Sequence, residues 1–481
     1  MNKKVAFLAR AAVYLLAFLV PPVLVSVVGM RAVESVRYEA PPDVAKVQAG
    51  ELPALPRHDP DKPTAVVLLS NQGAEVTDVL APYEVLSESG AFNVYTAAPE
   101  RKAVTLSGHL DVLPQLSLAE LGQRLGGEDP DVIVVPEMPD IGSPGHRPVA
   151  EWLREHAEGS GTVVSVCNGA QVLADAGLLD GRRATANWAN MAEWERRYPD
   201  TEWVRGLRYV EDGNVLTAAG VTSGIGATLH VIRGYVGEEA ATALAQKIGY
   251  PDQRVGDEPR IPADRLTVSD RALYVLWTAY GWGKPRIGVV LTEGTSEIEL
   301  ASVLDVYPGP VLTANTTTLT PEGPRSPVRT EHGLYFFPRS DLDSEPGFDR
   351  LLVTGGTAPS VTDPRVRSWA REKGLELEFI HAHAPADFPF DATLSDLAKH
   401  ENASVARFTA RLLEYPIGHL GLAGGGWPFA YLLRPLAVGL LGLALVVFTG
   451  RLLGSATKRS RHSPEGTSTG ASAKPVAKAR R

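Results

Sequence analysis

The chain has 481 residues, 44 % of them hydrophobic, which is enough for two or three ordinary domains with apolar cores. Its single cysteine excludes an intrachain disulfide, and no Cys/His spacing is typical of a structural zinc site, so we expect no metal. No phosphate-binding glycine motif occurs, so we expect no nucleotide cofactor. The chain has a net charge of −9, and its middle is strongly acidic between two basic ends, which makes nucleic acid an implausible partner.

Two apolar segments, one near each end, are long enough to cross a membrane. Residues 11–30 carry no charge, and residues 430–450 are apolar except for Arg434. At about 1.5 Å per residue, a helix over either segment spans roughly 30 Å of hydrocarbon. The sequence therefore predicts an N-terminal transmembrane anchor over 1–31 and a C-terminal transmembrane helix over 429–450.

The charges beside these segments predict how the chain crosses the membrane. Residues 1–31 carry four basic residues and no acidic one, and the tail 451–481 carries eight basic residues and only Glu465. Because basic flanks stay in the cytoplasm, we expect both termini there and the main domains outside the plasma membrane of a bacterium, with the lipid bilayer as a partner. A cleaved signal peptide is the alternative for the first segment. The composition of the tail is typical of disorder.

Between these segments, short apolar runs alternate with helical patterns. After a Pro-rich spacer over 32–61, strand-like runs such as TAVVLLS (64–70) and DVIVVPE (131–137) are each followed by a helix pattern. This alternation is typical of parallel βαβ units and predicts an α/β domain over 62–251, with a parallel sheet flanked by helices. Ligands of such sheets bind beyond the carboxyl ends of the strands.

A second, shorter α/β domain is predicted over 284–416, joined to the first by a linker with a helix over 252–283. Three collinear windows repeat, and KPTAVVLLSNQGAEVTDVLAPYEVL at the first start pairs with KPRIGVVLTEGTSEIELASVLDVY at the second. This repetition indicates a duplication. The second copy lacks the counterpart of about residues 168–222, and its His381 falls near the position that Cys167 occupies in the first copy.

Cys167 lies where the strand TVVSV gives way abruptly to a helix pattern. The small residues Ser165 and Gly169 on either side are what a sharp strand-to-helix corner requires, as in a nucleophile elbow. A helix N-terminus beneath the sulfur would lower the pKa of the thiol, and the amide of Asn168 would help to hold an oxyanion. Free cysteine is often only a buried packing residue, so that interpretation stands beside the functional one.

The runs VVSVCNGAQVLADAGLLDGRRATANWAN and LTAAGVTSGIGATLHVI resemble the ThiJ/PfpI family of the class I glutamine amidotransferase-like superfamily, in particular its isocyanide-hydratase branch and the ligand-type domains of AraC-class regulators. The resemblance covers 62–251 well and 284–416 weakly. It implies two flavodoxin-like α/β domains with parallel sheets, bracketed by the two transmembrane helices. It also implies that Asp78, aligned with Glu299 in the second copy, contacts the thiol of Cys167.

The sequence also departs from the pattern of the family. Asn187 stands in A-T-A-N-W where relatives often have histidine, and Asn168 follows the cysteine, so the Cys–His pair of a peptidase or amidotransferase is absent. Glu137 and its neighbour replace a Gly-Gly pair that the second copy keeps at 355–356. Glu137 either places a carboxylate near the thiol, which would raise the thiol pKa, or points to solvent. His146, in the loop that follows, is the one histidine that could reach the pocket.

Two functions therefore remain open, and both use a small molecule as ligand or substrate. In the first, Cys167 and Asp78, with Asn168, Glu137 and Asn187 around the pocket, hydrate or hydrolyse a small electrophilic compound. In the second, the chain is a non-catalytic module at the membrane that binds a small molecule or senses oxidant through the thiol. Homodimerisation, and pairing of the two domains within one chain, are both open roles for the second copy, which keeps the sheet without the cysteine corner.

Overall fold

A computed structural model describes residues 3–39, 55, 57–251, 260–262, 264–344, 347–382, 387–422 and 424–460 of the chain. The chain forms two compact units, one made of Met1–Val27 with Ala430–Arg481 and the other of Val28–Phe429. Much of the predicted spacer, part of the predicted linker and most of the predicted basic tail lie outside the described residues.

The first unit contains the two apolar helices, α1 (Lys3–Val36), which continues into the second unit, and α15 (Leu433–Ser460). Each contains a stretch long and apolar enough to cross a membrane, so the two predicted segments are helical, while membrane spanning itself stays a prediction. A Cβ atom at Gly442 would lie 2.4 Å from the carbonyl oxygen of Ala17. The two helices therefore approach each other closely at a glycine, as small residues allow between membrane helices.

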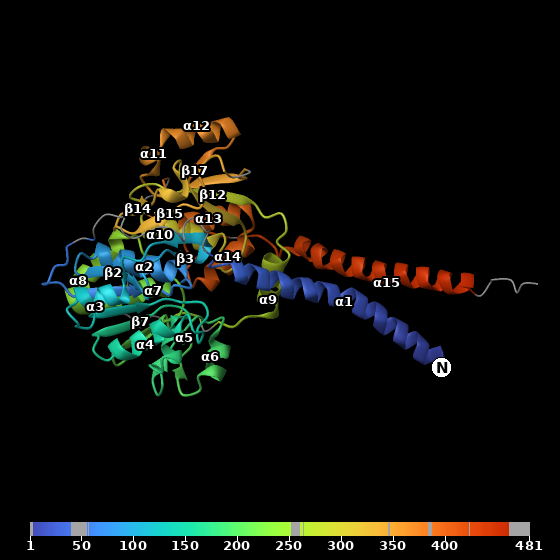
Figure 1. The fold of residues 1–481 in the computed structure, drawn as a ribbon, viewed down its shortest axis with the longest axis horizontal. Helices are drawn as coiled ribbons and strands as arrows, with labels where there is room; N and C mark the ends of the chain where they lie inside the picture. Colours follow the sequence, from blue (N-terminus) through green and yellow to red (C-terminus); the bar gives the residue numbers. More distant parts are fainter. Residues whose placement is uncertain are drawn as a thin grey trace, which may run out of the picture. The chain divides into compact units, whose positions relative to one another are not determined.

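A seven-stranded sheet forms the centre of residues 57–251, called the first half below (Figure 1). The strand order is β10-β11-β7-β6-β1-β2-β5, and all neighbours pair in parallel except β10 and β11. Helices α2 and α7 pack on one face of this sheet, and α4 and α5 pack on the other. Strands β1 and β6 are wholly buried because both faces are covered, which explains their unbroken apolar runs. The predicted helix-flanked parallel sheet is confirmed.

The elements of the first half follow one another in short alternating segments. Its strands are β1 (Thr64–Leu68), β2 (Asn93–Ala98), β3 (Val104–Leu106), β4 (Leu110–Val112), β5 (Leu116–Ser117), β6 (Val132–Val135), β7 (Thr162–Ser165), β8 (Arg183–Ala184), β9 (Glu202–Trp203), β10 (Tyr209–Asp212) and β11 (Val215–Ala218). Its helices are α2 (Val76–Glu88), η3 (Ser107–His109), α3 (Leu118–Arg124), α4 (Arg147–His156), α5 (Gly169–Asp175), α6 (Met191–Arg197), α7 (Ser223–Val236) and α8 (Glu238–Lys247).

Residues 284–416, the second half, contain a four-stranded parallel sheet of order β13-β12-β16-β17. In chain order, β12, β13, β16 and β17 correspond to β1, β2, β6 and β7 of the first half. Their order in the sheet then matches the order β2-β1-β6-β7. The shared order supports the predicted duplication, which stays a prediction, as does the division into two domains.

The strands of the second half are β12 (Arg286–Val290), β13 (Asn315–Leu319), β14 (Val328–Arg329), β15 (Tyr335–Phe337), β16 (Arg350–Val353) and β17 (Leu377–Phe379). The helices are α10 (Glu297–Val306), η4 (Gly323–Arg325), α11 (Ala358–Val361), α12 (Pro364–Lys373), α13 (Pro389–His400) and α14 (Ala403–Leu412).

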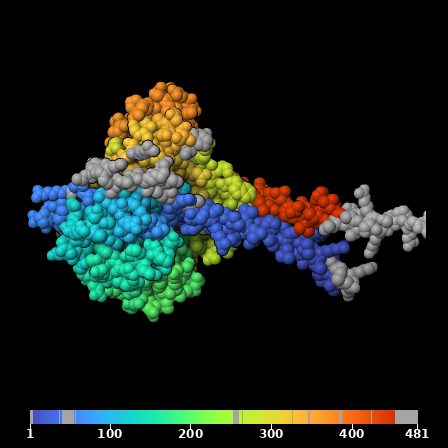
Figure 2. Space-filling view, in the orientation of Figure 1, coloured from blue at the N-terminus to red at the C-terminus, as the bar shows by residue number. Residues whose placement is uncertain are grey.

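The two halves share one apolar core. Helices α2 and α10 contribute to the same buried cluster. In Figure 2 the yellow to orange residues form the upper part of this unit, and the cyan to green ones form the lower part. A small sheet of order β14-β15-β4-β3 combines strands from both halves, with Phe336 of β15 opposite Val112 of β4. Helix α9 (Val268–Ala279) lies in the connection between the halves, where the sequence predicts a helix. Both halves belong to the single unit Val28–Phe429.

Candidate active site

Cys167 lies at the corner between β7 and α5, in a strained backbone conformation. Its φ angle is 55°, in the left-handed region that few residues other than glycine adopt. A Cβ atom at Gly169 would lie 2.1 Å from the carbonyl oxygen of Val135, so only glycine fits where the corner passes the neighbouring strand. The strand-to-helix corner that the sequence predicts is therefore present.

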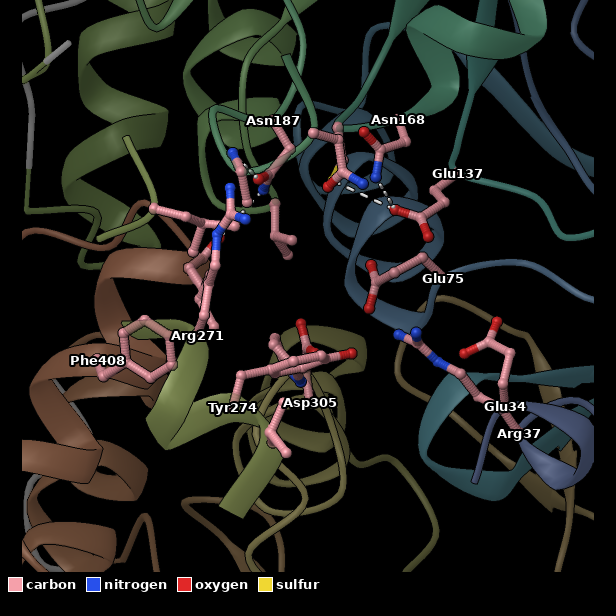
Figure 3. Close-up of a pocket in the computed structure, with 18 residues that line it drawn as sticks. Glu34, Arg37, Glu75, Glu137, Asn168, Asn187, Arg271, Tyr274, Asp305 and Phe408 are labelled. Carbon is pink, nitrogen blue, oxygen red and sulfur yellow. Dashed lines mark hydrogen bonds between the residues drawn. The ribbon is translucent and has the colours of Figure 1, made fainter. Parts of the chain in front are cut away.

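The corner faces a cavity of about 520 Å³, which is large enough for a small organic molecule (Figure 3). Both halves, the connection between them and the end of α1 contribute to its wall. Cys167 itself is 3 % exposed, so the thiol is reached only from the cavity. The lining side chains that carry the argument below are Glu34, Arg37, Glu75, Glu137, Cys167, Asn168, Asn187, Asn190, Arg271, Tyr274, Asp305, Phe408 and Leu412.

Glu137 is the carboxylate that contacts the thiol. It follows β6, the strand beside β7, and its Oε2 atom accepts a hydrogen bond from the Cys167 thiol at 3.5 Å. The same oxygen accepts a hydrogen bond from Nδ2 of Asn168 at 2.8 Å, which fixes the carboxylate beside the sulfur. Of the two orientations that the sequence leaves open for Glu137, the structure has the one beside the thiol.

The surroundings raise the pKa of the Cys167 thiol well above its ordinary value. Burial is the main cause, followed by the negative charges of Asp78, Glu137 and Glu75, while the backbone N–H of Asn168 acts weakly in the opposite direction. The prediction that a helix N-terminus lowers this pKa is wrong here, because α5 has only seven residues and the acidic neighbours outweigh it. The thiol therefore keeps its proton at neutral pH.

Asp78 lies behind the thiol pocket rather than on its surface. It is fully buried in the first turn of α2, and its Oδ2 atom accepts a hydrogen bond from the backbone N–H of Glu137 at 3.0 Å. Its Oδ1 atom has no hydrogen-bond partner among the described residues. Burial, and then the charges of Glu75 and Glu137, raise its pKa. Asp78 thus positions the segment that carries Glu137, and its contact with the thiol is electrostatic.

The two asparagines that the sequence predicts at the pocket, Asn168 and Asn187, both line the cavity and both have structural partners. Asn168 accepts a hydrogen bond from the indole N–H of Trp194 at 3.0 Å, in addition to its bond with Glu137. Asn187 donates from Nδ2 to the backbone carbonyl of Leu412 at 3.1 Å, so it ties the first half to α14. An oxyanion role for the backbone amide of Asn168 stays a prediction. Of the predicted site residues, the structure places Cys167, Asn168, Glu137 and Asn187 on the cavity and Asp78 behind it.

Five charged residues on the cavity wall, Glu34 among them, were not predicted from the sequence. Glu75 is the N-cap of α2 and accepts a hydrogen bond from the backbone N–H of Asp78 at 2.7 Å, and its spacing of three residues from Asp78 is the one signal that indicates it. Arg37, Arg271 and Asp305 come from the end of α1, from α9 and from α10. No local pattern marks these three, because tertiary packing brings them to the cavity.

The second half repeats part of this arrangement without a thiol. The backbone N–H of Gly356 donates to Glu299 at 2.7 Å, as that of Glu137 does to Asp78. His381 follows β17 by two residues, as Cys167 follows β7, so it occupies the position that the sequence predicts. It is buried, and burial lowers its pKa to about 3, so it is neutral.

His146 is not among the residues that line the cavity. It is completely buried at the start of α4, and neither ring nitrogen has a hydrogen-bond partner among the described residues. Burial lowers its pKa. No histidine of the described part of the chain lines the cavity, so no imidazole there serves as a base for Cys167.

Three groups of described side chains bring potential metal-ligand atoms within 4.8 Å of one another. In the site, these are the atoms of Asp78, Glu137 and Cys167, and each of the three already takes part in the hydrogen bonds above. The other two groups are Glu84 with Glu297 and His332, and Glu378 with Asp396 and His400. His332 pairs with Glu297, and Asp396 pairs with both His400 and Arg350, so these groups have protein partners. The expectation of no metal stays untested.

Comparison with known proteins gives the family. The model of the DJ-1/PfpI family matches residues 64–233. An isonitrile hydratase from Pseudomonas putida is 31 % identical over 184 residues, which cover 36 % of this chain and 72 % of that protein. The HTH-type transcriptional regulator CdhR from Pseudomonas aeruginosa is 32 % identical over 127 residues, which cover 26 % of this chain and 38 % of the regulator.

Among solved structures, Drosophila melanogaster DJ-1beta is 24 % identical, with a TM-score of 0.33, and the match covers 38 % of this chain and 96 % of that one. The family model covers the sheet and the cysteine corner, and the match to the hydratase extends over most of its length. The predicted resemblance is confirmed: this chain belongs to the DJ-1/PfpI family.

Proposed function

We propose that this protein is a membrane-anchored, cysteine-dependent hydratase or hydrolase that acts on a small electrophilic compound. The observation that carries the proposal is the hydrogen bond from the Cys167 thiol to Glu137 at the wall of the cavity. A nucleophile paired with a carboxylate that accepts its proton is a minimal catalytic arrangement, and here Glu137 takes the part that histidine has in Cys–His enzymes. The kinship with an isonitrile hydratase makes isonitriles the first substrates to test.

The chemistry of an isonitrile suits a thiol that stays protonated. Sulfur bonds to the terminal carbon while the thiol proton passes through Glu137 to that same carbon, which gives a thioimidate on Cys167. Water then adds across the C=N bond, which places its oxygen on carbon and one proton on nitrogen. The C–S bond breaks as the carbonyl forms, and the hydroxyl proton passes to sulfur. The net reaction joins one water to one isonitrile and releases an N-substituted formamide, with the cysteine regenerated.

The test uses the full-length chain in detergent with benzyl isonitrile, and the formyl proton of the product is followed by NMR. We expect turnover that Cys167→Ser abolishes and that Glu137→Gln lowers by about a hundredfold, within the range for loss of a positioned proton-transfer group. Glu151→Gln, an exposed carboxylate on α4, serves as the matched control and should not change the rate. Formation of formamide no faster than in buffer would overturn the proposal.

The second candidate is a ligand or oxidant sensor, and one observation favours it. Glu34 lies near the end of α1 and Arg37 follows it, and both line the cavity, so a ligand there touches residues continuous with the apolar N-terminal helix. The kinship with the regulator CdhR is compatible with this role. Oxidation of Cys167 to the sulfinate by peroxide, together with altered self-association and no isonitrile turnover, would support the sensor instead of the enzyme.

A further inference from the structure

The cavity contains two arginines in very different surroundings. Arg37 interacts electrostatically with Glu137, Glu34 and Glu75, so neighbouring acids balance its charge. Figure 3 shows it beside Glu34 and Glu75. Arg271 is exposed to the cavity, and no ion pair of the described residues includes it.

Arg271 is held in place by the helix that carries it. Arg271 and Tyr274 are three residues apart on α9, so they share the face that lines the cavity. The acid next to Arg271 in the sequence, Asp270, is engaged elsewhere, because Arg411 of α14 donates to both of its carboxylate oxygens, at 3.2 and 3.1 Å. This ion pair fixes α9 against α14 and leaves the guanidinium of Arg271 free to bind a ligand.

The acids that line the cavity have other partners. Glu75 accepts hydrogen bonds from the Asp78 backbone and the Ser107 hydroxyl, and Asp305 accepts one from Thr77 at 2.8 Å. Burial raises the pKa of both Glu75 and Asp305, so these carboxyl groups hold a proton more readily than usual and repel an anion less. The positive charge of Arg271 is therefore the one that the cavity leaves uncompensated among the described residues.

Donor groups and an apolar surface lie near Arg271. Figure 3 shows its guanidinium pointing toward Asn187, on the side of the cavity that carries the cysteine corner. The backbone N–H of Asn190 donates to the carbonyl oxygen of Asn187 at 3.1 Å, so Asn190 lies beside Asn187 on the cavity wall. No hydrogen bond within the described residues involves the side-chain amide of Asn190. Phe408 and Leu412, one turn apart on α14, supply the apolar wall. A flat anion with a short carbon chain matches this combination, since a guanidinium binds a carboxylate through two parallel hydrogen bonds.

We propose that the substrate carries a carboxylate, which Arg271 binds with the help of Asn190, while the electrophilic carbon lies over Cys167. The inference rests on the proposed function and specifies its substrate class as small anionic electrophiles. The family model matches residues 64–233, and Arg271, Asp305 and Phe408 all lie outside this region. The proposed selectivity for a carboxylate therefore comes from parts of the chain beyond the matched region.

The experiment compares isocyanoacetate with isocyanoacetamide, which differ only in the exchange of the carboxylate for a neutral amide of the same shape. With the full-length chain in detergent, we expect the KM for isocyanoacetate to be about tenfold lower, as one charge-assisted contact provides. Arg271→Gln should raise that KM about tenfold, with kcat within twofold and the kinetics of the amide unchanged. Arg265→Gln removes an exposed arginine that belongs to the same connection but does not line the cavity. This control should leave KM and kcat unchanged for both compounds.

The outcomes separate this inference from the proposed function. Equal KM values for the two compounds, unaffected by Arg271→Gln, would overturn the carboxylate site and leave the enzyme intact. If neither compound is turned over, the hydratase proposal fails, and binding of isocyanoacetate is then measured by ligand-observed NMR. Binding that Arg271→Gln weakens about tenfold would still support the carboxylate site, and binding that this change leaves unaltered would overturn it.

Discussion

Cys167 shares its surroundings with three carboxyl groups, and this sets the chemistry that the sulfur can perform. Glu137 accepts its proton, while burial, and then the charges that Asp78, Glu137 and Glu75 carry when ionised, disfavour the thiolate. Attack on an amide needs a free thiolate, so a thiol that keeps its proton is a poor nucleophile toward amides. The same thiol is better suited to addition, in which one carbon of the substrate receives both the sulfur and the proton. The surroundings of the thiol thus favour addition chemistry over proteolysis.

Removing the charge of Glu137 should make the thiol more reactive toward alkylating reagents. In the full-length wild-type chain, labelling of Cys167 by iodoacetamide should be slow at pH 8 and should increase only above about pH 9, the ordinary pKa of a thiol. Glu137→Gln keeps the acceptor for Asn168 and lowers the thiol pKa, so labelling at pH 8 should be about tenfold faster. Because Cys167 is the only cysteine, total alkylation measured by mass spectrometry reports on this site. A rate that stays at the wild-type value, as expected for Glu151→Gln, would contradict the electrostatic account.

At the scale of elements, the contact between α2 and α10 joins the two halves through a buried carboxyl group. Glu84 of α2 accepts hydrogen bonds from the Ser296 hydroxyl at 2.6 Å and from the Ile298 backbone N–H at 2.8 Å, so it caps α10 from outside. Burial, and then the charge of Glu297, raise the pKa of Glu84 to about 8. The capping group is therefore protonated at neutral pH.

This raised pKa makes the stability of the unit depend on pH. Since folding raises the pKa of Glu84 from 4.5 to about 8, the folded state holds a proton that the unfolded state releases, and the stabilisation present below pH 4.5 is lost as pH rises to 8. The contribution of this group should decline by about 1.4 kcal/mol per pH unit. Glu84→Gln keeps an oxygen acceptor and cannot ionise. Measured by denaturant unfolding, its free energy of unfolding should therefore fall less between pH 6 and pH 8 than that of the wild type. An equal loss in both proteins would show that Glu84 is not the titrating group.

For the molecule as a whole, the basic residues beside the two apolar helices predict that both ends lie in the cytoplasm. Residues 57–422 then lie on the opposite side of the membrane, where the substrate would be met before it enters the cell. This orientation is a proposal, and it makes the cavity a site for extracytoplasmic compounds.

A reporter tests this orientation directly. Green fluorescent protein fused after Arg481 should fluoresce, because this reporter folds in the cytoplasm and not after export through the general secretory route. The same reporter inserted between residues 251 and 260, in the connection between the halves, should remain dark at an equal level of full-length chain. Fluorescence at the inner insertion, or a dark C-terminal fusion, would contradict the proposed topology.

The sequence was sufficient for the part of the site that follows consecutive strands of one sheet. Asp78, Glu137 and Cys167 come after β1, β6 and β7, which are neighbours, so their carboxyl ends had to meet at one edge. Arg271 and Asp305 could not be predicted, because α9 and α10 reach the cavity only through packing that no local pattern records. The sign of the thiol pKa shift was left open between a helix N-terminus that lowers it and Glu137 that raises it, because burial, its largest cause, follows from tertiary packing.

The backbone carbonyl of Leu412, which accepts a hydrogen bond from Asn187, belongs to a helix that closes the cavity from the second half. When a separate subunit closes a site, the site falls apart on dilution, and its occupancy follows the amount of protein made. Here the closing helix is covalently attached, so its local concentration is fixed by the chain itself. Even a single molecule of the chain would therefore carry a complete pocket.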